Sequence, residues 1–213
     1  KSLARTLLTT WPDTPAARAD GLPLQTAALS DHERFAVAER LIGRFRYHEA
    51  RELLTGLLDH AQLGTEARWQ LGVIGLKKLR DDPEGARAIF EDFARRRGPH
   101  REDALFYLIR TYVKQDRYDE ALKLGDEYDR RYPRGKYAER VGYYRGWLPY
   151  DERKCSKALP HLRRYVKRFG TRRSLTRGFI AWCHLREGHW QRAIDAYEQL
   201  VDYGGALVRG KAW

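Results

Sequence analysis

The sequence contains no methionine, even at position 1, and cysteine occurs only twice in 213 residues, as Cys155 and Cys183. The missing start residue indicates a processed product or an excised piece, so the absence of a signal peptide says nothing about secretion. Two cysteines do not make a disulfide framework. The favoured interpretation is two half-buried thiols that pack as small hydrophobes. The alternative is a single bridge between them.

Long apolar runs and catalytic motifs are also missing. No stretch of about 18 uncharged apolar residues is present, which excludes a transmembrane helix. There is no glycine-rich phosphate loop, no G-x-S-x-G elbow and no nucleophile with a recognisable base nearby. The stretch His48–Glu52 begins like a zinc-protease motif, but Glu52 stands where the second histidine is needed. We therefore expect no catalytic site, no metal and no cofactor in this chain.

The sequence does contain a repeat. An alanine recurs after a short polar or turn-like segment and before a helical apolar pattern, with spacings of 36, 35, 37 and 35 residues. The five alanines are Ala50, Ala86, Ala121, Ala158 and Ala193. Apolar residues at helical intervals lie on both sides of each turn, and no segment alternates with period two. This predicts an all-α chain built from helix–turn–helix units.

The units resemble the tetratricopeptide (TPR) repeat. The best match is Leu105–Tyr112, followed by Tyr118 and Ala121 and then Pro133. The unit around Ala86 needs two extra residues at Asp81-Asp82. The resemblance implies a right-handed α-solenoid in which neighbouring helix pairs bury each other's apolar faces.

The repeat spacing divides the chain into three parts. We expect a partial, irregular repeat over 1–30 and about five TPR-like repeats over 31–203. Residues 204–213 would then begin a truncated further repeat, after a helix end at Gly204-Gly205. The next repeat alanine would fall beyond Trp213, which indicates that the chain is cut from a longer protein or is ordered only to this point.

Two short segments are similar to a narrower family. Ser2–Ala17 and Leu207–Trp213 look like parts of the superhelical scaffold of bacterial soluble lytic transglycosylases, which act on peptidoglycan. The hallmark of the catalytic domain in that family is a Glu-Ser pair with a Gly-Leu-Met-Gln segment downstream. This chain has no Glu-Ser pair and no methionine, so the resemblance extends to the scaffold alone.

The TPR resemblance also implies a binding groove, because the first helix of each pair lines the concave face in that family. Repeat spacing places an aromatic-rich set of residues on this face, with Tyr143, Tyr144 and Trp147 as the strongest candidates. The full set of groove candidates is Phe106, Tyr107, Arg110, Tyr143, Tyr144, Trp147 and Trp182. These rings could stack on a peptide or a sugar. The alternative is that several of them pack between adjacent first helices, as aromatic residues commonly do.

Positive charge is concentrated in the second half of the chain. The net charge is +12, and residues 153–186 contain eleven Lys or Arg and no acidic residue. The basic patch predicted here comprises Arg163, Arg164, Lys167, Arg168, Arg172, Arg173 and Arg177. Such a patch steers anionic partners. The alternative is a solvated face whose counter-charges come from neighbouring repeats.

These observations predict a non-catalytic binding scaffold. One hypothesis is the superhelical part of a periplasmic or cell-envelope lytic transglycosylase whose groove guides peptidoglycan or a partner. The other is a stand-alone TPR adaptor, in the envelope or the cytoplasm, that binds a peptide or an acidic protein segment. Nucleic acid is disfavoured because no helix-turn-helix, RRM or zinc-finger pattern is present.

Overall fold

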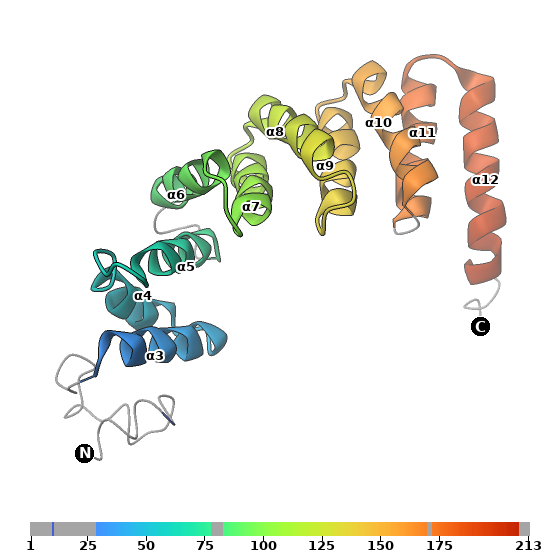
Figure 1. Cartoon of the computed structure of the whole chain (residues 1–213). Helices are drawn as coiled ribbons and strands as arrows, with labels where there is room; N and C mark the ends of the chain where they lie inside the picture. The colour runs from blue at the N-terminus through green and yellow to red at the C-terminus, as the bar shows by residue number, and fades with distance from the viewer. Residues whose placement is uncertain (1–9, 11–28, 78–82, 170–171, 209–213) are drawn as a thin grey trace. The chain divides into compact units, whose positions relative to one another are not determined.

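The computed structural model describes residues 10, 29–77, 83–169 and 172–208, and the predicted all-α class is confirmed for them. The described residues form ten helices of two turns or more and no strand, and Figure 1 shows their order along the chain. The helices are α3 (Asp31–Gly43), α4 (Tyr47–Thr55), α5 (Gly64–Lys77), α6 (Pro83–Arg95), α7 (Arg101–Lys114), α8 (Tyr118–Arg131), α9 (Ala138–Asp151), α10 (Cys155–Arg168), α11 (Arg173–Arg186) and α12 (Trp190–Val208).

The chain divides into two compact units, residues 1–104 and 105–213. In the first unit α3 packs on α4, α4 on α5, and α5 on α6. In the second unit α8 packs on α9, and each later helix packs on the next up to α12. The first helices of two successive pairs, α9 and α11, also touch directly. Consecutive helix pairs therefore stack within each unit, which is the arrangement of an α-solenoid.

Each repeat alanine lies early in the second helix of its pair. The helices α4, α6, α8, α10 and α12 all begin three residues before it, and all five alanines are at most 2% exposed. The small side chain lets the partner helix approach closely. Gly146 serves the same purpose on α9, since a Cβ there would lie 2.6 Å from Leu162 Cδ2 on α10.

The turn has the same form in four of the five helix pairs. Four pairs are joined by three residues, at 44–46, 115–117, 152–154 and 187–189. Phe45, Asp116, Arg153 and Gly188 have φ between 55° and 74°, and each lies five residues before its repeat alanine. This left-handed conformation reverses the chain and costs a non-glycine residue about 1–2 kcal/mol. Five residues, 78–82, separate α5 from α6, which accounts for the two extra residues noted in the sequence.

Cys155 and Cys183 form a disulfide bond, so the interpretation favoured from the sequence, two free thiols, is wrong. The bond joins the start of α10 to α11, with Cα atoms 5.1 Å apart. Both cysteines are buried in a cluster with Ala158, Leu159 and Leu162. Sequence spacing cannot reveal this pairing, because it depends on two adjacent helices placing both residues at one crossing point.

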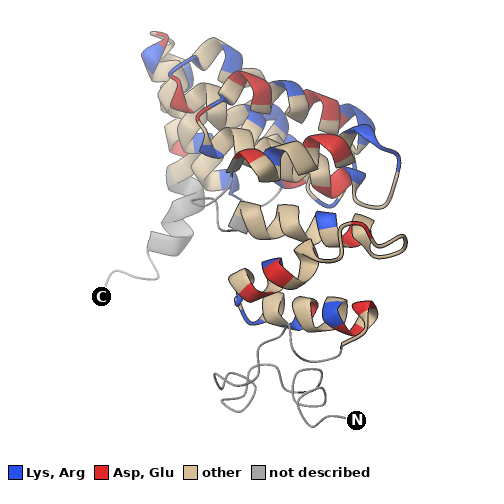
Figure 2. Cartoon of the chain, turned by 90° about the vertical axis from the view of Figure 1, so that its left-hand side faces the viewer, with Lys and Arg blue, Asp and Glu red and all other residues tan. Residues whose placement is uncertain are grey.

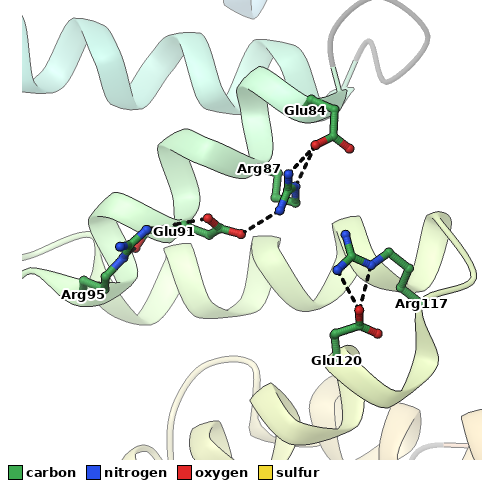
Figure 3. A network of polar contacts seen from close by, with 6 residues as sticks. All are labelled: Glu84, Arg87, Glu91, Arg95, Arg117 and Glu120. Atoms are coloured by element: carbon green, nitrogen blue, oxygen red, sulfur yellow. Dashed lines mark hydrogen bonds and ion pairs between the residues drawn. The ribbon is translucent and has the colours of Figure 1, made fainter.

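Exposed helix faces carry local ion pairs between residues three or four apart. Figure 3 shows Arg87 on α6 between Glu84 and Glu91, with Arg95 on the far side of Glu91. The same figure shows Arg117, which precedes α8, paired with Glu120 at 2.6 Å. Pairs of this kind contribute about 0.3–0.5 kcal/mol each, so packing rather than charge holds the units together.

The predictions for the two ends of the chain can be compared with the structure to different extents. The partial repeat predicted over residues 1–30 lies almost entirely outside the described residues. Helix α3 begins beyond it, at Asp31, with Ser30 and Glu33 forming a capping box. At the other end, the predicted helix end at Gly204-Gly205 is wrong, because α12 continues to Val208. Glycine costs a helix about 1 kcal/mol but does not stop it. No helix among the described residues combines the length and apolar character needed to cross a bilayer.

Candidate functional site

The first helices of the second unit carry positive side chains on aromatic rings. Beside α7 and α9, the guanidinium carbons of Arg110 and Arg140 lie 5.9 and 5.7 Å from the centre of the Phe106 ring. Lys136, just before α9, lies 5.2 Å from the Tyr137 ring. A cation over an aromatic face is attracted by about 0.5–1 kcal/mol at exposed sites. The rings therefore favour these positions of the cations.

Phe106 is a buried ring that supports the neighbouring cations and does not contact a ligand itself. It is 1% exposed and stacks on Tyr137, with ring centres 3.9 Å apart. This leaves no ring face for a ligand and matches the alternative of rings packed between first helices. The neighbouring Tyr107 is half-buried, with its ring 6.4 Å from Tyr137.

The aromatic residues of α9 lie together, as their spacing predicts. Tyr143 and Trp147 are nearly parallel with ring centres 6.4 Å apart, and Tyr144 is tilted against Tyr143 at 6.3 Å. All three are half-buried. Arg172, the residue before α11, lies 5.1 Å from the Tyr143 ring. Burial raises the pKa of the Tyr143 hydroxyl, against the opposing charge of Arg172, so this group is neutral at physiological pH.

Trp182 belongs to a different cluster. Its ring meets the edge of Tyr150 at 5.1 Å, and Tyr150 in turn stacks on Phe179 at 4.2 Å. These three residues pack against the buried disulfide. Arg186 lies over the Trp182 ring at 5.5 Å. Helix α11 therefore also carries a cation on an aromatic ring, as α7 and α9 do.

An open hollow of about 500 Å³ lies between the starts of α9 and α11. It is lined by Lys136, Tyr137, Glu139, Arg140 and Arg172. Its carboxylate, Glu139, lies 3.8 Å from Arg172 and accepts a hydrogen bond from the Tyr165 hydroxyl at 3.2 Å. Three cations and one carboxylate leave a positive surplus beside the aromatic rings. This surface suits an acidic chain that also offers apolar contacts.

The predicted basic patch separates into four groups. Arg164 and Arg168 of α10, together with Arg145 of α9, converge on Asp129 of α8 at 3.1, 3.0 and 2.7 Å. Burial acts to raise the pKa of Asp129, but the Arg168 hydrogen bond and the charges of Arg145 and Arg164 outweigh it and lower that pKa. For this group the counter-charge comes from the preceding repeat, as the alternative interpretation expects.

The other basic residues are placed differently. Arg172 borders the hollow described above, whereas Arg163, Lys167 and Arg177 border a second hollow beside α12. The Nε atom of Arg173 is buried, without a hydrogen-bond partner in the described part of the chain. Figure 2 shows Lys and Arg beside Asp and Glu on most described helices, so the positive surplus is a feature of particular sites.

Comparison with known proteins agrees with the all-α repeat fold. Two models of the tetratricopeptide repeat match residues 79–136 and 180–203. The chain has the TPR fold. No curated protein sequence matches it.

Solved TPR structures show the same fold at low sequence identity. MamA from Desulfovibrio magneticus RS-1 is 17% identical with a TM-score of 0.65, over 86% of this chain and 97% of that one. YrrB, described as a TPR protein with an unusual peptide-binding site, is 13% identical with a TM-score of 0.61, over 81% and 86%. TPR-like repeats of a Podospora anserina kinesin light chain reach a TM-score of 0.54 at 16% identity, over 84% and 96%.

Among the described residues, one cluster brings together side chains of the kind that ligate metal ions. His184, Glu187 and His189, at the turn between α11 and α12, place ligand atoms within 4.8 Å of one another. Arg163 already donates a hydrogen bond to Nε2 of His184 at 2.9 Å. Burial lowers the pKa of His184 most, and the charges of Arg163 and Arg192 lower it further. This positive surrounding disfavours a divalent cation.

The cation–ring pairs on the first helices α7, α9 and α11 and on the residues just before them make up a surface of the second unit, called the first-helix face below. The sequence patterns do not identify several of its residues. Lys136, Tyr137, Arg140 and Arg186 were not among the groove candidates. Arg140 lies four residues before Tyr144 on the same helix, a spacing that places both on one face and could have identified it. Tyr137 lies just before α9, so the helical pattern gives no signal for it.

Proposed function

We propose that this chain is a non-catalytic scaffold that binds an extended acidic segment of a partner protein along the first helices of its second unit. The observation that carries the proposal is the series of cations held on aromatic rings beside α7, α9 and α11. Cations that the rings already favour in these positions lose less side-chain freedom when they pair with successive carboxylates. The half-buried rings of Tyr144 and Trp147 offer apolar contacts between them.

The TPR fold supports this reading, since a related fold in YrrB carries a peptide-binding site by its own description. No arrangement of nucleophile and base was found in the sequence. An acidic ligand is favoured over a neutral one because the hollow between α9 and α11 has three cations and a single carboxylate. Desolvated carboxylate–guanidinium contacts would give both affinity and register.

Binding of a fluorescently labelled, glutamate-rich peptide that also contains aromatic residues tests the proposal. Arg140→Gln should weaken binding by about tenfold or more, because it removes one charge-assisted hydrogen bond worth about 1.5–3 kcal/mol. Tyr144→Ala and Trp147→Ala should weaken it through loss of ring contact. Arg130→Gln, an exposed position on the second helix α8, is the matched control. Affinity that is unchanged in all three test variants, with helicity retained, would overturn the proposal.

The narrower hypothesis of a lytic transglycosylase scaffold remains a second proposal. One structural feature supports it: the buried Cys155–Cys183 bond suits an oxidising compartment such as the periplasm. The segments that carry the sequence resemblance lie largely outside the described residues. The gene beyond the codon for Trp213 discriminates the two hypotheses. A lysozyme-like segment with a Glu-Ser pair would support the scaffold role, whereas further TPR units or a stop codon would exclude it.

A further inference from the structure

A second hollow, of about 380 Å³, lies between α10, α11 and α12 and shares no residue with the first-helix face. It is lined by Arg163, Val166, Lys167, Arg177, Ile180, His184, Arg192, Asp195, Ala196 and Gln199. Four of these ten side chains are cationic, and one is a carboxylate. Helices α10, α11 and α12 thus line a hollow with a surplus of positive charge.

Arg163 is held in place by a buried histidine. His184 is 4% exposed, and its Nε2 atom lies 2.9 Å from Nη2 of Arg163. Burial lowers the pKa of His184, and the charge of Arg163 lowers it further, so the ring is neutral and can accept this hydrogen bond. The bond occupies one end of the guanidinium group. The remaining N–H groups of this exposed side chain stay available to a ligand.

Lys167 and Arg192 face the hollow from α10 and α12. In the part of the chain that the structure describes, neither makes an ion pair with a carboxylate. Asp195, on the same wall as Arg192, accepts a hydrogen bond from Gln191 at 2.9 Å. The contrast within α10 is informative. Arg164 and Arg168 are neutralised by Asp129, whereas Lys167 on the same helix has no carboxylate partner among the described residues.

Apolar side chains complete the lining. Val166, Ile180 and Ala196 come from α10, α11 and α12 respectively, and each is partly exposed. A ligand that fits this surface has a multiply charged anionic group for the cations and a small apolar part for these three residues. We propose that the hollow binds a small organic phosphate. A phosphate monoester carries about −1.5 to −2 charges and three acceptor oxygens, which matches converging Arg and Lys side chains better than a single carboxylate does.

Calorimetric titration of the full chain with phenyl phosphate tests this inference. Inorganic phosphate and benzoate serve as probes for the charged and the apolar part alone. We expect phenyl phosphate to bind more tightly than either, and added NaCl to weaken it. Benzoate that binds as well as phenyl phosphate, or no heat from phenyl phosphate at millimolar concentration, would overturn the proposal.

Two pairs of variants locate the binding site. Lys167→Gln and Arg192→Gln should each lower the affinity for phenyl phosphate about tenfold, the loss of one charge-assisted contact. Lys157→Gln, exposed on the same helix α10 but outside the hollow, and Arg130→Gln on α8 remove the same charge and should leave affinity unchanged. Circular dichroism checks that all four variants fold. Equal losses in the test and control variants would refute the site.

Discussion

Breaking the Cys155–Cys183 bond should destabilise the second unit by an amount that can be worked out from the structure. The bond closes a loop with a sequence separation of 28 residues. In the chain-entropy model such a loop restricts the unfolded chain by about 12 cal/mol/K, which corresponds to about 3.6 kcal/mol at 25 °C. The domain is a stack of short repeats, so this loss should appear first in the unfolding of α10 and α11.

Urea titration followed by circular dichroism and by tryptophan fluorescence measures this effect. Trp182 packs beside the bond and reports on it locally. The reduced protein should lose about 3–4 kcal/mol of unfolding free energy. The variant with both Cys155→Ala and Cys183→Ala should lose about 1–2 kcal/mol more, because it also removes two buried sulfur atoms from the packed cluster.

Two results would refute this reasoning. The denatured protein, never exposed to reductant, should show no free thiol in a thiol titration, and two free thiols would contradict the pairing. If the pairing holds but reduction changes the unfolding free energy by less than about 0.5 kcal/mol, loop closure would not be the source of stability. Equal losses in the reduced protein and the alanine variant would show that the sulfur atoms contribute no packing.

Two further predictions follow from charge and backbone geometry. Asp129→Asn should destabilise the second unit by about 2–3 kcal/mol at pH 7, because it leaves Arg145, which is 13% exposed, without one of its two carboxylate partners. The lowered pKa of Asp129 means that its stabilisation is present above the unfolded value near 3.9 and is lost as pH falls through the folded value. Urea titrations of Asp129→Asn and the parent chain should therefore converge on acidification, and a constant gap down to acid pH would contradict the ion-pair account. Arg153→Gly should raise stability by about 0.5–1 kcal/mol and Gly188→Ala should lower it by about 1 kcal/mol, because both positions have a positive φ. Thermal unfolding measures both, and changes of the same sign would rule out backbone strain as the cause.

Local pattern predicted the helices well. The four-residue segments that end in Ala50, Ala86, Ala121, Ala158 and Ala193 coincide with the starts of α4, α6, α8, α10 and α12. This worked because a short turn and a small crossing residue are encoded within a few positions. The glycine pair predicts too early an end for α12, because the helix penalty of glycine is small compared with that of proline.

The candidate site was harder to predict, because burial and pairing depend on residues far away in the sequence. Phe106 and Tyr144 both belong to the aromatic set, yet Tyr137 covers Phe106 whereas Tyr144 stays half-buried. Arg164 and Lys167 look alike on one helix, but Asp129, 35 residues before Arg164, pairs with the arginine. No helical periodicity contains that information. The placement of the binding face therefore remains a prediction for experiment.

The three-residue turns inside four of the five pairs have a practical consequence for engineering. Connections between pairs vary in length, over 56–63, 96–100, 132–137 and 169–172. The fold thus tolerates change between repeats, while the four three-residue turns share one backbone geometry. A reporter domain or affinity tag should be accepted at an exposed between-pair position such as Arg134. The same insertion after Asp116 would separate a helix from its partner.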